Sequence, residues 1–357
     1  MESVIRLAEQ PNKTLLPLTY PEEIRDTTSQ QILHAPSFYE EESPFRESPQ
    51  VKTRKPFIEA NTKAVTLDHL QNDCITPVFS KDNEVTISHS QFIETVWECT
   101  QRMFRNCIVE EPEIRVSHII KGRTPEAIHK TVKELTDEDK TIYYERMMFC
   151  MEIPSIAETI DGCRLNLSVG GVRAYNQENL YSKKGFEKFK VFVGFKNMVC
   201  CNMCVSTDGL YEEIRVTDTS SLMTKMTELI VSYNAKQHLE RMKALLDISM
   251  TESQFAQLVG KARLYQFLPP AQRKQLPAFE FTDCHLNTIA KAYYNDAAFA
   301  CNKQREIDLW RVLNLFTGAN KSSYIDLFLA RSRNAAEFIS GVSKALAGES
   351  EHKWFVE

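Results

Sequence analysis

The pattern of apolar and polar positions changes twice along the chain. Residues 1–60 contain seven of the fourteen prolines. Because proline lacks a backbone donor and disfavours a helical residue before it, we predict a flexible, extended arm there. Residues 61–250 contain most of the strand-like alternation, and residues 251–357 carry apolar residues at helical spacing. The pattern therefore predicts three parts: an N-terminal arm, an α+β core and a helical C-terminal region.

The strand signals are strongest in the middle of the core. Three segments are aromatic-rich or alternate in polarity, and they are residues 142–153, 164–175 and 188–203. An Asp-Gly pair then indicates a turn between two further strands, at 204–206 and 210–216. Gly170 and Gly171 interrupt the second segment, which indicates a bulge or a close backbone approach. These segments predict a central, mostly antiparallel sheet.

Two predicted helices accompany this sheet. Ser88 or Ser90 can cap a helix that runs through about Phe104. The segment 217–246 follows several capping residues and has an apolar face, so it should form one long helix that covers the sheet.

The C-terminal region begins with a capping box at Thr251, which predicts a helix that stops before Pro269. Further helices are predicted near residues 285–300, 305–316 and 324–346. Gly318 and Gly348 stand where C-terminal caps are expected. The fold class is therefore α+β, a sheet covered by a long helix and followed by a helical C-terminal half.

The first part of the core is predicted to carry a basic loop. Short strands are expected at 74–79 and 85–87, and another at 114–120. The last one ends at Lys121-Gly-Arg-Thr, and Pro125 should then begin a helix to about Leu135. A basic loop beside a helix N-terminus favours anionic groups, although a solvated loop with an ordinary cap would have the same sequence.

Charge and composition limit which ligands and which cellular location we expect for this protein. The formal charge of −5 gives no global attraction to nucleic acid or anionic lipid, so a polyanion site needs a local basic patch. The start of the chain lacks the features of a signal peptide, and no apolar stretch approaches the ~20 residues of a membrane span. Ten cysteines spread over 357 residues are expected to be free thiols. We expect a cytoplasmic protein without a membrane segment.

The best candidate site is a basic, aromatic segment from Arg173 to Lys196. It holds six basic residues against two glutamates, beside tyrosines and phenylalanines. That combination can hold phosphates and stack bases, although a hairpin with buried aromatics and solvated lysines would look similar. The predicted nucleic-acid-binding residues are Lys121, Arg123, Arg173, Tyr175, Tyr181, Lys183, Lys184, Lys188, Lys190 and Lys196.

Two other kinds of chemistry have weaker support in the sequence. The run Cys200-Cys201-x-x-Cys204 holds one pair at zinc-ligand spacing but lacks a matching second pair, so we expect buried thiols, with Cys201 and Cys204 as weak metal candidates. A magnesium-dependent nuclease needs clustered carboxylates, and those of the core are scattered. No cofactor is predicted.

Three motifs resemble a known family. They are Ser117–Arg123, Gly170–Asn176 and Val191–Cys200. With them, the chain from about Leu67 to Phe355 resembles an uncharacterised domain-of-unknown-function family of bacterial conjugative elements and prophages. It is also distantly similar to a larger phage and plasmid protein family, in which a strand ending Val-Cys-x-Asn precedes a helical half. The resemblance implies an accessory role in a mobile genetic element, such as DNA handling or anti-restriction.

These observations lead to one functional prediction and two alternatives. We predict a non-enzymatic, nucleic-acid-binding accessory protein, with single-stranded DNA as one candidate target. The first alternative is a protein-interaction module, such as an inhibitor of a host defence enzyme. The second is a metal-dependent nuclease. The sequence leaves the partner and the oligomeric state open.

Overall fold

The computed structural model describes residues 55–76, 86–124, 127, 129–177, 185–349 and 351–357. Pro56–Glu357 belong to one unit, in which the predicted core and the helical region pack together. Phe57 and Ile58 are fully buried in this unit. The last residues of the predicted arm are therefore part of the fold. The predicted strand at 85–87 is not formed in its described residues, Thr86 and Ile87. Part of the predicted strand at 74–79 lies outside the described residues, as does nearly all of the arm.

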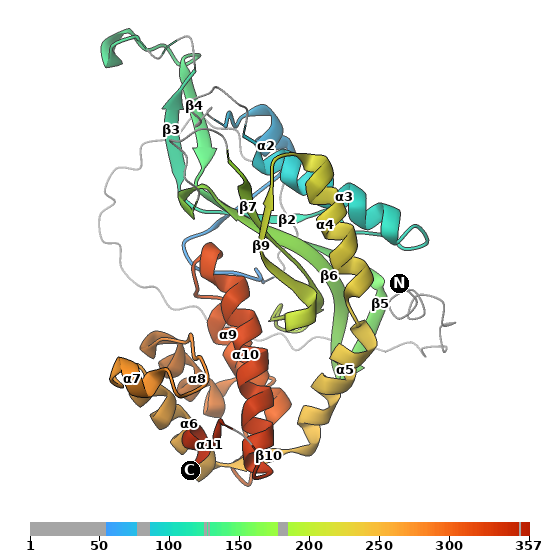
Figure 1. Ribbon diagram of the computed structural model, residues 1–357, viewed down its shortest axis with the longest axis vertical. Helices are drawn as coiled ribbons and strands as arrows, with labels where there is room; N and C mark the ends of the chain where they lie inside the picture. Colours follow the sequence, from blue (N-terminus) through green and yellow to red (C-terminus); the bar gives the residue numbers. More distant parts are fainter. Residues whose placement is uncertain (1–54, 77–85, 125–126, 128, 178–184, 350) are drawn as a thin grey trace, which may run out of the picture. The chain divides into compact units, whose positions relative to one another are not determined.

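An antiparallel sheet of seven strands forms the centre (Figure 1). Its order is β1-β2-β5-β6-β7-β8, and β9 also pairs with β7. This confirms the predicted α+β class and the antiparallel sheet. The strands are β1 (Lys63–Val65), β2 (Glu113–Val116), β5 (Arg146–Ile160), β6 (Cys163–Ala174), β7 (Glu187–Asn197), β8 (Met203–Cys204) and β9 (Leu210–Val216).

The predicted pairing around the Asp-Gly turn is wrong. β8 and β9 each pair with β7 instead of with each other. Between them, Thr207–Gly209 form a 3-10 turn, η4. After β8 the chain turns away from β7. It then pairs with β7 again as β9, nearer the N-terminal end of β7.

Helices α3 (His89–Met103) and α4 (Thr219–Ser232) pack together and contact one face of the sheet. The capping box at Ser88 confirms the predicted start of α3. Phe92 of α3 packs against Phe149 and Phe189, with ring centroids 5.2 and 4.7 Å apart. A Cβ atom on Gly171 would clash with the Phe92 ring and lie 2.9 Å from the Lys190 carbonyl oxygen. The glycine is therefore explained by a close approach of helix to strand.

The long helix predicted over 217–246 is two helices. α4 ends at Ser232, and α5 (Ala235–Ala244) begins after Asn234, whose side chain accepts a hydrogen bond from the Gln237 backbone N–H. A capping asparagine in the middle of the apolar pattern thus divides the helix. A 3-10 turn, η5 (Leu245–Asp247), follows.

The opposite face of the sheet packs against α10 (Ile325–Leu346) and the N-terminal segment. Phe57, Met148, Phe192 and Phe328 belong to this second apolar cluster. The remaining elements of the helical region are β10 (Ser249–Thr251), α6 (Glu252–Tyr265), α7 (Pro270–Arg273), α8 (Asp283–Asn295), β11 (Glu306–Asp308), α9 (Leu309–Asn320) and α11 (Lys353–Val356).

The capping box at Thr251 is present. Gly348 has a φ of 91° just after α10, as expected of a C-terminal cap. Gly318 lies inside α9, so its predicted capping role is wrong.

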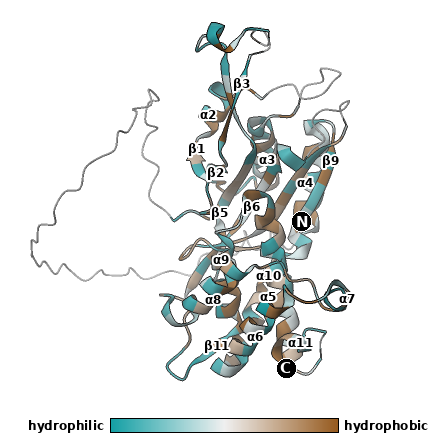
Figure 2. Cartoon of the chain, turned by 90° about the vertical axis from the view of Figure 1, so that its left-hand side faces the viewer, coloured by the Kyte–Doolittle hydropathy of each residue, from teal (hydrophilic) through white to brown (hydrophobic). Residues whose placement is uncertain are grey.

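A separate two-stranded sheet stands beside the main one and extends away from it in both views (Figures 1 and 2). Its strands are β3 (Ile119–Arg123) and β4 (Lys140–Tyr144). The helix predicted from Pro125 is not formed in the described part of the connection, which holds a 3-10 turn, η2 (Val132–Glu134). Asp139 explains this, because its carboxylate accepts hydrogen bonds from the Lys130 ammonium and the Thr136 backbone N–H and so closes the connection as a turn.

Two short elements complete the described chain, α2 (Leu67–Asn72) and the 3-10 turn η3 (Tyr175–Gln177). Among the described residues, no helix has the length and apolarity that crossing a membrane requires.

Candidate nucleic-acid interface

Arg173, one of the predicted phosphate-binding residues, lies in the interior. Its side chain is 0% exposed and forms an ion pair with Glu187. The guanidinium lies 4.6 Å from the ring centroid of Tyr175 and 4.4 Å from that of Phe189. The Glu187 carboxylate also accepts the Ile87 backbone N–H at 3.1 Å. Arg173 and the equally buried Tyr175 therefore support the sheet and cannot reach a phosphate in the folded protein.

Lys196 is also internal. Only 2% of its side chain is exposed, and its Nζ lies 2.9 Å from Glu113 and 3.0 Å from Glu152. Burial opposes the charged form of Lys196, but Cys150 and the two carboxylates outweigh it and raise its pKa above the usual range. This lysine is therefore the charged centre of a buried network on the α10 side of the sheet.

The other predicted lysines of this segment differ in their surroundings. Lys190 donates to the Asp326 backbone carbonyl at 2.7 Å, and burial lowers its pKa. The Lys188 ammonium lies 3.7 Å from Glu213 at the surface. The other three predicted members, Tyr181, Lys183 and Lys184, lie outside the described residues. Counting charge along the sequence overestimated this patch, because glutamates from other strands neutralise its inner members.

The β3–β4 hairpin carries the exposed basic residues. Its register places Arg123 directly opposite Lys140, and Lys121 opposite Ile142. Residues directly opposite each other share a face, as do residues two apart on one strand, so Lys121, Arg123 and Lys140 lie on the same face. All three are exposed. We call these three residues the hairpin basic face.

The partners of the hairpin basic face are few. Arg123 donates to the Lys130 backbone carbonyl at 2.5 Å, and Lys140 contacts the exposed Asp137 at 2.7 Å. The Lys121 side chain makes no hydrogen bond or ion pair with any described residue. Exposed contacts of this kind are weak, so these cations are available to a ligand.

A cleft of about 560 Å³ lies at the base of the hairpin. We call it the basal cleft, and it is lined by Glu59, Ala60, Asn61, Thr62, Lys63, Ser117, His118, Arg146, Tyr324 and Ile325. Four parts of the chain build it: the segment before and into β1, the β2–β3 junction, the β4–β5 junction and the start of α10. Sequence analysis did not select Lys63, Arg146 or Tyr324, since only the fold brings them together.

Backbone bonds fix the walls of the basal cleft. The N–H groups of Glu59 and Ala60 both donate to the Lys321 carbonyl, at 2.8 and 3.2 Å. Arg115 donates to the hydroxyl and the carbonyl oxygen of Thr62, at 2.9 and 3.1 Å. The Arg146 backbone N–H donates to Ser117 Oγ at 3.1 Å. The N-terminal wall is thereby tied to the sheet and to the α9–α10 corner.

Cys200, Cys201 and Cys204 lie where the sheet meets the helical region. Burial raises the pKa of Cys200 to about 12 and raises that of Cys204 further. All ten cysteines are free, and no group of three or more metal-binding side chains occurs among the described residues. The run lies in a loop that is fastened to the helical region, because Asn202 Nδ2 donates to the Asn314 carbonyl at 3.0 Å and the Lys321 ammonium donates to the Cys200 carbonyl. The Val-Cys-x-Asn motif therefore joins the sheet to α9.

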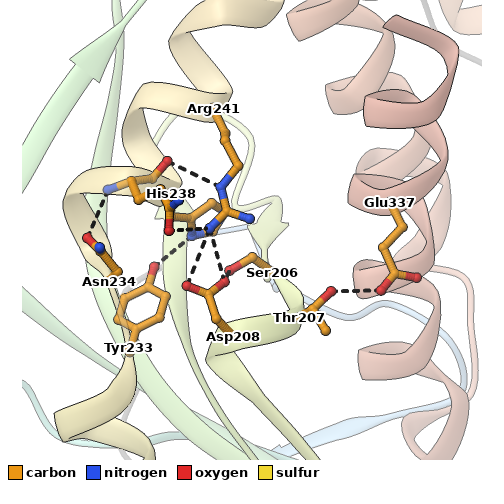
Figure 3. Close-up of polar contacts among 9 residues, drawn as sticks. Ser206, Thr207, Asp208, Tyr233, Asn234, His238, Arg241 and Glu337 are labelled. Atoms are coloured by element: carbon orange, nitrogen blue, oxygen red, sulfur yellow. Dashed lines mark hydrogen bonds and ion pairs between the residues drawn. The ribbon is translucent and has the colours of Figure 1, made fainter. Parts of the chain in front are cut away.

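A polar cluster at the α4–α5 junction has the residue types of an active site (Figure 3). Tyr233 OH and His238 Nδ1 are 2.6 Å apart, and Ser206 Oγ donates to Asp208 at 2.6 Å. Arg241 lies 3.4 Å from the same carboxylate. Burial lowers the pKa of His238 to about 4 and raises that of Tyr233 well above its usual value. Both groups are therefore uncharged near neutral pH, and the contact of Arg241 with Asp208 ties α5 to η4.

A family model supplies the relationship of the chain to other proteins. The model described as "Domain of unknown function, B. Theta Gene description (DUF3871)" matches residues 38–356. The chain belongs to the DUF3871 family. This confirms that the chain belongs to a family of unknown function. The match begins at residue 38, earlier than Leu67, where the resemblance was expected to begin. No curated protein and no solved structure gave a significant match.

Proposed function

We propose that this DUF3871 protein binds nucleic acid through the phosphate backbone, which lies along the hairpin basic face and passes the basal cleft. The observation that supports this most is the cross-strand pairing of Arg123 with Lys140. Like charges directly opposite each other destabilise a two-stranded sheet. A bound polyanion would remove that repulsion, and a mobile-element accessory role is compatible with such a ligand.

The rim of the basal cleft extends the basic surface beyond the hairpin. Lys63 and His118 are exposed at this rim. A nucleic-acid strand whose phosphates contact Lys121 and Arg123 would continue past His118, because His118 directly precedes β3, whose third and last residues are Lys121 and Arg123. The proposed interface is thus a hairpin face continued by a cleft.

The salt dependence of binding tests the proposal quantitatively. If three phosphates contact Lys121, Arg123 and Lys140, their share of the log–log salt slope is about −2.1 for a single strand and about −2.7 for duplex DNA. Raising salt from 50 to 200 mM should then weaken this part of the binding by roughly 18-fold or 42-fold. Replacing all three residues with Gln should flatten the slope by that amount.

The matched control changes the same charge elsewhere, with Lys236, Lys303 and Lys344, all exposed, replaced by Gln. Fluorescence anisotropy with labelled single-stranded and double-stranded DNA and RNA gives the affinities. If the wild type binds none of these at 50 mM salt, or if the control flattens the slope as much as the hairpin variant, the proposal fails. The protein-interaction alternative would then take its place.

A further inference from the structure

The basal cleft has an aromatic wall that the proposed phosphate contacts do not use. Tyr324 is 58% exposed, although it directly precedes Ile325, which is buried. It is the N-cap residue of α10, but its side chain makes no capping hydrogen bond. Its backbone carbonyl accepts the Leu327 N–H at 3.0 Å, so the ring is presented from a fixed backbone. An exposed ring on a rigid helix start, inside a cleft, is a stacking platform.

The charges around this ring favour a neutral group over a phosphate. Arg146 lines the cleft with its Cζ 5.8 Å from the Tyr324 ring centroid. Its Nη atoms contact Glu145 at 3.3 Å and Asp326 at 3.5 Å, and Glu59 also lines the cleft. Carboxylates on several sides repel a phosphate placed deep in the cleft. They also accept hydrogen bonds from amino groups, while Arg146 donates to carbonyl oxygens and ring nitrogens.

The contacts of Arg146 are loose enough to be exchanged. Charge-assisted hydrogen bonds have lengths of about 2.7–2.9 Å, shorter than either of its carboxylate contacts. The Arg146 side chain is 23% exposed, so part of it can be reached from the cleft. An acceptor on a planar ligand can therefore bind this guanidinium at the cost of a weak contact only. A nucleobase has the required flat ring and both donors and acceptors at its edge.

We propose that the basal cleft binds the base of one unpaired nucleotide, stacked on Tyr324, with Arg146 and Glu59 contacting the base edge. The cleft volume of about 560 Å³ is within the usual range of small-molecule sites, about 300–1,000 Å³, and so admits one nucleotide. This rests on the proposed nucleic-acid function and adds its target class. Bases inside a duplex are stacked on their neighbours and cannot enter, so the protein should prefer single strands.

Tyr324→Leu tests the stacking contact. Losing one base–aromatic stack weakens single-strand binding by about 5- to 140-fold, and Tyr324→Phe should keep the affinity. The probe is a thymidine 12-mer with 2-aminopurine at its centre, because weakly stacking thymines leave that base fluorescent until it stacks on the ring. Tyr294→Leu is the control, because Tyr294 is 52% exposed and has Arg305 5.5 Å from its ring but does not line the cleft.

A 12-mer with abasic sites separates the contribution of the bases to binding from that of the phosphate backbone. Tyr324→Leu should leave its binding unchanged, and should leave duplex binding unchanged as well. If the 12-mers bind but Tyr324→Leu weakens them no more than Tyr294→Leu, the base-binding site is wrong while the proposed phosphate contacts stand. If no nucleic acid binds, the proposed function itself fails.

Discussion

Replacing Lys196 with Met should destabilise the fold far more than a surface lysine substitution does. The ammonium is the cation between Glu113 and Glu152, and the Glu152 side chain is only 6% exposed. Removing one partner of a buried ion pair leaves an uncompensated charge, which typically costs about 3–5 kcal/mol. Lys196→Met keeps the apolar part of the side chain, so the loss should reflect charge rather than packing.

The magnitude can be converted into a melting temperature. For a chain of this length, 1 kcal/mol corresponds to roughly 2 °C, so Lys196→Met should melt about 6–10 °C below the wild type. Lys188→Met is the matched control on the same strand, since the Lys188 ammonium lies 3.7 Å from Glu213 at the surface. Its expected loss is about 0–1 kcal/mol.

A second substitution identifies the source of the loss. In the double variant Lys196→Met with Glu152→Gln, the more buried of the two uncompensated carboxylates is gone, while the Gln side-chain oxygen can still accept the hydrogen bond that Asn166 Nδ2 donates to Glu152 at 2.9 Å. Part of the lost stability should return. Differential scanning calorimetry gives all four melting temperatures. If Lys196→Met melts within about 2 °C of Lys188→Met, the buried network does not hold the sheet as we infer, and Lys196 becomes a candidate binding residue again.

Three further predictions follow from single positions. Phe57→Ala should destabilise the protein by about 3–5 kcal/mol in chemical denaturation, because this ring at the edge of the predicted arm is fully buried; an unchanged midpoint would contradict its place in the core. Ellman's reagent should modify the exposed Cys284 first and Cys150 only on unfolding, since burial raises the pKa of Cys150 to about 12; rapid loss of all ten thiols would contradict this. The pKa of His238 is lowered to about 4 from about 6.5 in the unfolded chain, so the unfolded state binds an extra proton between these values and stability falls as pH drops through that window. His238→Asn, which keeps an acceptor for Tyr233, should show a smaller drop in melting temperature between pH 7 and pH 4.5.

Sequence signals predicted the fold well where the structure of a segment depends only on residues close to it in the chain. The capping boxes at Ser88 and Thr251 and the alternation of the long strands depend on neighbouring residues only. The interruption after α4 also had a local signal, because Asn234 is a good capping residue. The pairing of β8 and β9 with β7 had none, since it depends on a strand earlier in the chain.

The candidate site was predicted less well because burial and partners are set by the whole fold. Arg173 and Lys196 looked basic along the sequence, but Glu187 and Glu152 neutralise them in space. Lys121 and Arg123 were recognised, whereas the position of Lys140 beside them required the hairpin register. Tyr324 follows a polar loop and gave no signal of its own, since the cleft in front of it is built by residues near both ends of the described chain.

The bonds that tie Glu59 and Ala60 to the Lys321 carbonyl have a kinetic consequence. They fix the distance between the N-terminal wall of the basal cleft and the start of α10 before any ligand arrives. A preorganised site needs little ordering on binding, so affinity is not spent on closing it. Association should then be a single step, with an observed rate that rises linearly with ligand concentration and depends on salt through electrostatic steering.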